Sequence, residues 1–277
     1  MSLLSPNLLR LFVSPRRVIG LRLSGLTGKN VVLKQIYRTE PGHEVDWHGA
    51  MLGVESAIRE LAGGLRRLEV LVSNHFAHYY LLAPQAAASK LSGDEERAYA
   101  HHCFAEVFGH NAEGWDVRVS YERAGVPRVA CAMEKEFLAG ISSRAEEAGL
   151  KLESVQPYLA AAFNQWRNQI DNRTLWLAVV EQGRLVLARF EDGRWTWLRS
   201  LRVGRRWMED LPDLIVREQH LAGTDVDVSA EVLVFCPEVP VLAVRPDSGM
   251  SIKQLQLPAL AGFSPVTDGA FGLALIG

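Results

Sequence analysis

The chain has few cysteines and almost no net charge, and each shortage excludes a class of protein. Its three cysteines, Cys103, Cys131 and Cys236, lie far apart in 277 residues and form no CxxC pair. Such a set predicts neither a disulfide framework nor a zinc site, and it indicates a reducing compartment. A net charge of −2 provides no broad positive field, so no nucleic-acid partner is expected.

A long apolar run is also lacking. The start of the chain is rich in leucine, but Pro6, Asn7 and Arg10 interrupt it. A membrane span needs about 20 apolar residues, and a signal peptide needs a basic region before its apolar core. We therefore expect neither, and predict that residues 3–13 form an arm packed on the core, with a peripheral membrane contact as the alternative.

The composition that remains is ordinary for a globular protein, with 48% hydrophobic and 22% charged residues. The length allows one large domain or two of moderate size.

The most structured stretch is 174–204, which predicts three strands joined by two tight turns. Residues 175–180 are all apolar, which suits a strand buried on both faces. Gln182-Gly183 and Asp192-Gly193 then interrupt the pattern, and Asp-Gly is a strong hairpin indicator because a type I′ turn needs positive φ. Residues 16–38 repeat the pattern on a smaller scale.

In that earlier stretch we expect strands at 18–23 and 31–37, joined by a turn at 25–30 that contains Gly25 and Gly28. Each hairpin unit is followed by a predicted helix and another strand. This repeated order predicts a mixed α/β fold with two similar halves.

Four pieces of the chain together resemble the actin-like ATPase superfamily. They are 17–37, 149–166, 175–199 and the Gly-Ala-Phe-Gly-Leu-Ala-Leu-Ile-Gly ending at 269–277. Within the superfamily, the chain most resembles the pilus-assembly adapter proteins (PilM-like) and the cytoplasmic actin-like domain of type II secretion inner-membrane proteins.

This resemblance implies an α/β, actin-like (RNase H-like) fold of two related halves with an inserted α/β subdomain. We place the first half at 1–171, the insertion at about 91–149 and the second half at 172–277. Within the insertion, Trp115 is expected to begin a small sheet, with Phe104 and Phe137 packed beneath it.

Active members of the superfamily bind a metal ion and phosphates through acidic residues on two phosphate hairpins. Here Arg22 stands where the first acid is expected, and Glu181 sits late in the second hairpin. The degenerate hairpins are marked by Gly25, Gly28, Glu181 and Gly183. At the adenosine side the chain has Cys-Pro-Glu-Val-Pro at 236–240, where prolines replace glycines. We therefore expect no catalytic residue, no cofactor and no metal.

The resemblance implies a non-enzymatic cytoplasmic scaffold or adapter of a type IV pilus or type II secretion-like assembly. It would lie at the inner membrane face, held there by the short cytoplasmic tail of an inner-membrane partner, and homo-oligomers are possible. The alternative is an actin-like ATPase or a sugar-kinase-like phosphotransferase, and a third reading is a self-assembling filament protein.

For the partner tail we predict a groove between an extended segment at 68–82 and a helix at 95–108. His75, Tyr79, His101 and Phe104 are the candidate lining residues, because aromatic groups with a polar tip suit an anchoring pocket; packing of the subdomain is the competing explanation for each. A separate basic cluster, Arg202, Arg205 and Arg206, is either a solvated loop or a contact for an acidic partner or a phosphate.

Overall fold

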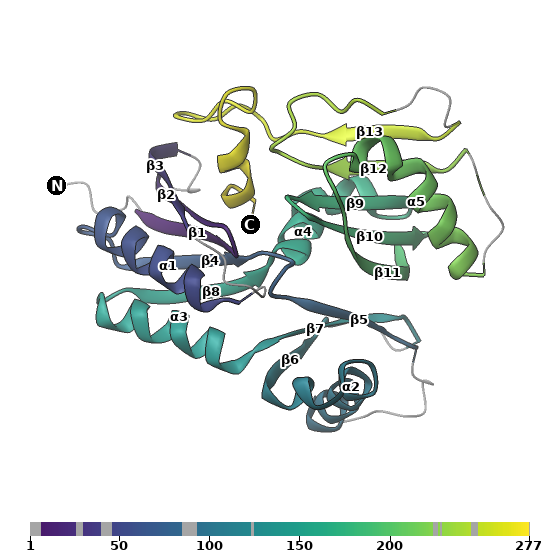
Figure 1. Ribbon diagram of the computed structural model, residues 1–277, viewed down its shortest axis with the longest axis horizontal. Helices are drawn as coiled ribbons and strands as arrows, with labels where there is room; N and C mark the ends of the chain where they lie inside the picture. Colours follow the sequence, from purple (N-terminus) through teal and green to yellow (C-terminus); the bar gives the residue numbers. More distant parts are fainter. Residues whose placement is uncertain are drawn as a thin grey trace.

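Three sheets and five α-helices make up the part of the chain that the computed structural model describes, residues 7–25, 30–39, 46–84, 93–122, 125–223, 227, 229–244 and 249–276 (Figure 1). The strands are β1 (Leu8–Ser14), β2 (Arg17–Ser24), β3 (Asn30–Arg38), β4 (Arg67–Val72), β5 (His78–Leu82), β6 (Trp115–Val119), β7 (Arg128–Glu134), β8 (Lys151–Pro157), β9 (Leu175–Glu181), β10 (Arg184–Glu191), β11 (Arg194–Arg202), β12 (Glu231–Phe235) and β13 (Ser251–Leu255). The helices are α1 (His48–Leu61), α2 (Gly93–Phe108), α3 (Lys135–Glu147), α4 (Tyr158–Ile170) and α5 (Trp207–Leu221), with 3-10 helices η1 (Gly109–Gly114) and η3 (Gly269–Ala274). In the described residues, none of the helices has the length and apolar character to cross a bilayer.

The two five-stranded sheets have the same connectivity. Their strand orders are β3-β2-β1-β4-β8 and β11-β10-β9-β12-β13, and in each sheet the first three strands in the chain are antiparallel and the last two are added in parallel. The antiparallel strands have 7, 8 and 9 residues in both sheets. The α/β fold of two related halves predicted from the sequence is therefore confirmed.

The first strand begins earlier in the chain than predicted. The apolar residues 8–13 do not form a packed arm but the greater part of β1, which lies in the middle of its sheet between β2 and β4. Every residue of β1 is buried, as is every residue of β9. A strand covered on both faces needs apolar side chains on both, which is why this run lacks the alternation of a half-exposed strand.

The hairpin that corresponds to β9–β10 is consequently β1–β2, whose turn is Pro15-Arg16. The turn at 25–30, which we expected in the first phosphate hairpin, joins β2 to β3 and so has the same place in its sheet as the turn between β10 and β11. Gly25 directly follows β2 and has a φ of +92°, and Gly28 lies outside the described residues.

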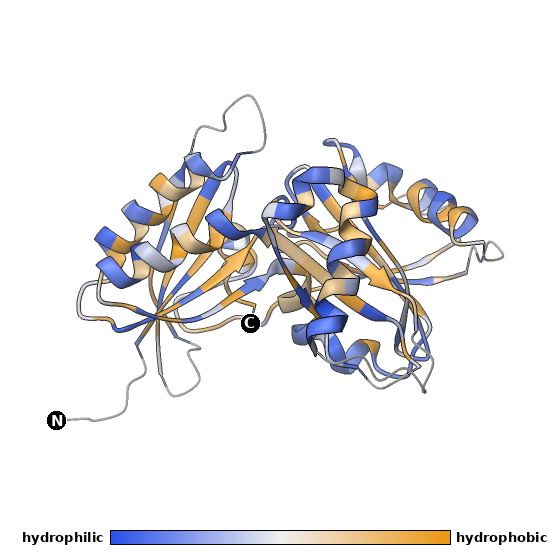
Figure 2. Cartoon of the chain, turned by 90° about the horizontal axis from the view of Figure 1, so that it is seen from below, coloured by the Kyte–Doolittle hydropathy of each residue, from blue (hydrophilic) through white to orange (hydrophobic). Residues whose placement is uncertain are grey.

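One hydrophobic core lies between the two large sheets, and a further core lies under each outer layer. α4 and η3 pack between the inner faces, while α1 and α3 cover the outer face of the first sheet and α5 that of the second. Figure 2 shows the strands mostly in hydrophobic colours and the helices with one polar face, as expected for helices that cover sheets.

A third sheet, in the order β5-β7-β6, lies below the large sheets and is covered by α2 (Figure 1). The segment at 68–82, predicted to be one extended stretch, is divided between two sheets: β4 belongs to the first large sheet and β5 to this small one. Trp115 and Phe104 pack together in the small core, as predicted. Phe137 does not, because α3 turns its apolar face to the first large sheet, where Phe137 contacts Phe76.

Candidate functional site

The ends of four strands meet where the two large sheets approach each other. We call this place the junction site and define it by residues 14–17 after β1, 73–75 after β4, 181–184 between β9 and β10, and 236–238 after β12. Binding sites of α/β folds commonly lie beyond the carboxyl ends of parallel strands, and here such ends come from both halves.

Glu181, the last residue of β9, is the buried centre of the junction site. Its side chain is 4% exposed. The Ser73 hydroxyl donates to its Oε2 at 2.5 Å and the Asn74 backbone N–H donates to its Oε1 at 2.7 Å. Burial raises the pKa of Glu181 to about 7, although the two hydrogen bonds and nearby Arg184 favour the ionised form. The carboxylate therefore joins the second half to the first rather than facing open space.

Asn74 links the same site to two further elements. Its Oδ1 accepts hydrogen bonds from the Tyr79 hydroxyl at 2.5 Å and from the Leu159 backbone N–H at 3.1 Å, at the start of α4. Its Nδ2, together with the hydroxyl of fully buried Tyr158, has no hydrogen-bond partner among the described residues. Unpaired polar atoms in a buried place are costly and need an explanation.

His75 holds the turn between β9 and β10. Its Nε2 lies 3.0 Å from the Gln182 carbonyl oxygen, so this nitrogen carries the proton and donates. Gly183 adopts a φ of +81°, and a Cβ placed there would lie 3.7 Å from the His75 ring. Burial lowers the pKa of His75, and the charges of Arg184, Arg16 and Arg202 lower it further, which keeps the ring neutral near pH 7.

Arginines lie at the turns of both hairpins of the junction site. Arg17 forms an ion pair with Glu238 at 2.5 Å, across the two halves. Arg16 is exposed in the first turn and Arg184 is half-buried at the end of the second. Over the described ranges, the structure contains no group of three or more His, Cys, Asp or Glu residues placed to hold a metal ion.

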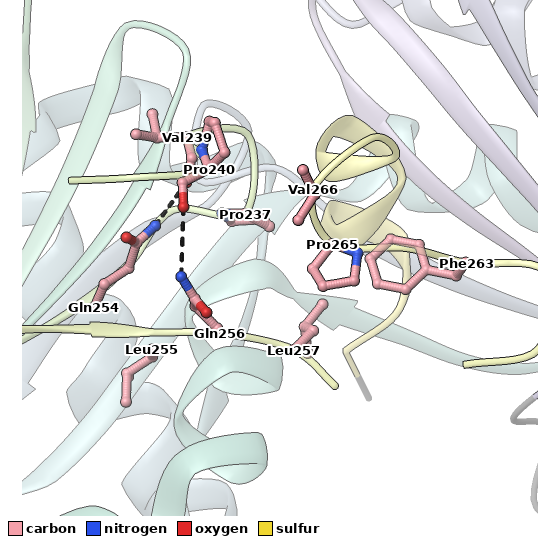
Figure 3. A pocket seen from close by; sticks show the side chains of 10 residues that line it. All are labelled: Pro237, Val239, Pro240, Gln254, Leu255, Gln256, Leu257, Phe263, Pro265 and Val266. Carbon is pink, nitrogen blue, oxygen red and sulfur yellow. Dashed lines mark hydrogen bonds between the residues drawn. The ribbon is translucent and has the colours of Figure 1, made fainter. Parts of the chain in front are cut away.

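The expected adenosine side lies next to β13 and the C-terminal loop. Figure 3 shows a small, mostly apolar pocket whose lining residues are Pro237, Val239, Pro240, Gln254, Leu255, Gln256, Leu257, Phe263, Pro265 and Val266. The side chain of Gln254 bridges its wall, donating to the Val239 carbonyl at 2.6 Å and accepting from the Leu242 N–H at 3.0 Å. The two prolines predicted to replace glycines therefore line this pocket.

The four residues predicted to line a partner groove are not brought together. Side chains alternate across a strand, so Tyr80 faces α2 and contacts Phe104, whereas Tyr79 points the other way, toward Asn74. Phe104 is 0% exposed and packs the small core, so it cannot line an open groove. His75 belongs to the junction site, and partly exposed His101 lies on α2.

Sequence reasoning missed most of the junction site. Ser73 and Asn74 are short polar residues at the end of an apolar run, and Arg16 and Arg17 follow another. Both positions could have been found by asking which residues directly follow each buried strand. These four residues come together only because the two halves pack against each other.

Comparison with known proteins gives matches by structure alone: no protein-family model matches the chain, and no curated protein matches it. The cytoplasmic domain of EpsL, an inner membrane component of the type II secretion system of Vibrio cholerae, superposes with a TM-score of 0.59 at 10% identity, covering 97% of this chain and 94% of that one. A Bacteroides thetaiotaomicron protein with an actin-like ATPase fold and unknown function gives 0.56 at 8% identity, covering 83% and 82%. A PilM–PilN type IV pilus biogenesis complex gives 0.53 at 14% identity, covering 77% and 66%. The chain therefore has the actin-like ATPase fold that its sequence resembles.

Proposed function

We propose that this chain is a non-enzymatic cytoplasmic scaffold or adapter of a type IV pilus or type II secretion-like assembly. In this proposal residues 1–171 form the first half, with an inserted subdomain, and 172–277 form the second. The similarity to the EpsL domain and to the PilM–PilN complex supports it, because both proteins belong to such systems. The chain would lie at the inner membrane face, bound to the short cytoplasmic tail of a membrane partner.

The main support for a non-enzymatic role is that the carboxylates of the junction site are already bonded to other groups of the protein. Both oxygens of Glu181 accept hydrogen bonds inside the protein, and Glu238 is paired with Arg17. A magnesium ion held between carboxylates and phosphates needs free oxygen ligands, and the first turn presents arginine instead. An actin-like ATPase or a sugar-kinase-like phosphotransferase is the alternative; the shared fold favours neither.

Magnesium and ATP together are expected to leave the melting temperature unchanged. A ligand present at 100 times its Kd stabilises the folded state by about 2.7 kcal/mol, a shift that thermal denaturation detects easily. The titration compares ATP with magnesium against ATP with EDTA. An increase in melting temperature that requires magnesium would favour the ATPase or kinase reading.

The partner test uses the full chain, which is tagged and purified from the membrane fraction of its own cells. We expect a single-pass inner-membrane protein to copurify, and removal of its cytoplasmic tail to abolish the interaction. Of the predicted groove residues, His101 is the partly exposed one on α2, so His101→Ala is expected to weaken capture without lowering the melting temperature. His102→Ala, which changes an exposed neighbour on the same helix, is the matched control. Capture that survives removal of the tail contradicts the proposal.

A further inference from the structure

One edge of the small sheet, formed by β6, has no strand beside it. β6 lies at one end of the order β5-β7-β6 and pairs with β7 alone (Figure 1). Just beyond β6, the Ser120 N–H donates to the Val129 carbonyl at 2.8 Å. Because backbone groups alternate in an antiparallel pair, those of Val117 and Val119 point away from β7. In the described part of the chain, these groups have no hydrogen-bond partner on that side.

The side chains of β6 give this edge an apolar face and a charged face. Trp115 and Val117 are buried in the small core, and Val119 packs against it. Asp116 and Arg118 point to the opposite face, because side chains alternate along a strand. Their side chains are 34% and 74% exposed, and the Arg118 Nε donates to the Asp116 carboxylate at 2.9 Å. The charged face of the edge therefore carries one acid and one base, two positions apart.

The sequence Trp-Asp-Val-Arg-Val at 115–119 is complementary to itself when read in the opposite direction. When a second β6 lies antiparallel with Val117 opposite its own copy, each Asp116 lies opposite the Arg118 of the other copy. Directly opposite side chains have Cβ atoms about 4.5–5.5 Å apart, which allows ion pairing. In the same register the two Val117 residues exchange backbone hydrogen bonds, since their free N–H and carbonyl groups face each other.

Charge and pleat also exclude the neighbouring registers. A shift by two residues places Asp116 opposite Asp116, or Arg118 opposite Arg118, and like charges directly opposite each other destabilise a strand pair. A shift by one residue turns the charged face of one strand to the apolar side of the other. The register centred on Val117 is therefore specified by the strand itself.

Two other sheet edges are blocked in ways that β6 is not. The Val31 N–H at the start of β3 already donates to the Ala261 carbonyl at 2.8 Å. β13 has an exposed lysine, Lys253, at its centre, and a lysine on an edge strand opposes the addition of another strand. β6 contains neither lysine nor proline, so it is open to strand addition.

We propose that β6 is a homodimer contact, at which two copies of this chain join their small sheets edge to edge. Asp116 and Arg118 of the two copies then alternate in sign around a two-fold axis, while Trp115 and Val119 continue the apolar face under α2. Tyr121, which follows β6 and is 99% exposed in the single chain, extends along the second copy. Pairing of short strands buries less than a standard interface, so the dimer is weak and reversible. This contact is separate from the tail of the proposed membrane partner.

The test measures the mass of the purified full chain by sedimentation equilibrium at increasing concentration. We expect a dimer with a Kd between about 1 μM and 1 mM, as for a small, transient contact. Asp116→Arg and Arg118→Asp should each weaken it by about tenfold or more, because each places like charges opposite one another on both sides of the axis. Glu209→Arg is the matched control for Asp116→Arg: it makes the same charge change on exposed α5 and should leave Kd nearly unchanged.

Mixing the two single variants is the decisive measurement. In a mixed pair, arginines of one variant face aspartates of the other at both positions, so the mixture should dimerise although neither variant does so alone. Both changes affect solvent-accessible side chains, so each variant should melt like the native chain.

Val119→Pro tests the backbone pairing, because it removes an N–H on the free edge, where a strand tolerates proline. It should weaken the dimer. A native chain that remains monomeric up to about 1 mM, a Val119→Pro chain or single variants that dimerise normally, or a mixture that remains monomeric would overturn the proposal. Asp116→Arg and Arg118→Asp should still capture the membrane partner, so failure here and failure of the adapter proposal give different results.

Discussion

Replacing Glu181 with alanine is expected to lower the free energy of unfolding by about 2–6 kcal/mol, because a buried donor left without its acceptor costs about 1–3 kcal/mol and Glu181 serves two. These donors are the Ser73 hydroxyl and the Asn74 backbone N–H, both in the first half. The change also removes the carboxylate that joins the halves, so the two halves should unfold less cooperatively.

The matched variant Glu181→Gln keeps the shape and removes the charge. Burial raises the pKa of Glu181 from 4.5 to about 7. Between these values the folded chain holds a proton that the unfolded chain has released, so stability contributed by this proton is complete below pH 4.5 and is lost as pH rises to about 7. The loss amounts to about 3 kcal/mol.

Denaturant unfolding of the native chain and both variants between pH 4.5 and 8 measures these effects. Glu181→Gln should match the native chain at pH 4.5 and exceed its stability at pH 8 by about 3 kcal/mol. An alanine variant as stable as the native chain, or a glutamine variant with the native pH dependence, would show that Glu181 is not the buried link described above.

Replacing Phe104 with alanine is expected to cost about 3–5 kcal/mol, the range observed for truncating a buried phenylalanine. Phe104 is fully buried and packs against Trp115, Tyr80 and Phe108. The cavity would lie between α2 and the small sheet, so this part of the protein should lose protection in hydrogen exchange first.

Val107→Ala is the control for this variant, because Val107 lies on the same helix but is 58% exposed. It should change stability by no more than about 0.5 kcal/mol. If the Phe104→Ala protein melts at the native temperature but no longer captures the membrane partner, Phe104 lines the binding groove as first predicted.

Local pattern was sufficient for much of the fold. The meander at β9, β10 and β11 follows from an apolar run and two turns, and Asp192 and Gly193 do adopt positive φ. The small sheet covered by α2 was predicted less completely than this meander. Its first strand, β5, lies only a few residues after β4, and an apolar stretch does not show that its two ends belong to different sheets.

The hairpin of the first half shows the same limit. Residues 175–180 are apolar throughout, whereas Arg10 interrupts the apolar run at 8–13, and this charge suggested a peripheral arm. In the structure Arg10 forms an ion pair with Glu69 of the neighbouring strand, at 2.7 Å. A charge can lie in a central strand when its partner comes from 59 residues away, and no local pattern contains that information.

The sequence by itself determined the class of fold, the repetition of its units and the prolines at 237 and 240, because strand periodicity, turn chemistry and residue identity are local properties. The tertiary structure decided which turns face each other. Arg16, Asn74, Glu181 and Glu238 are scattered over about 220 positions and are polar residues of no special pattern in the chain. They become one site only when the two sheets pack around α4, since burial and the distance between charges are set by that packing.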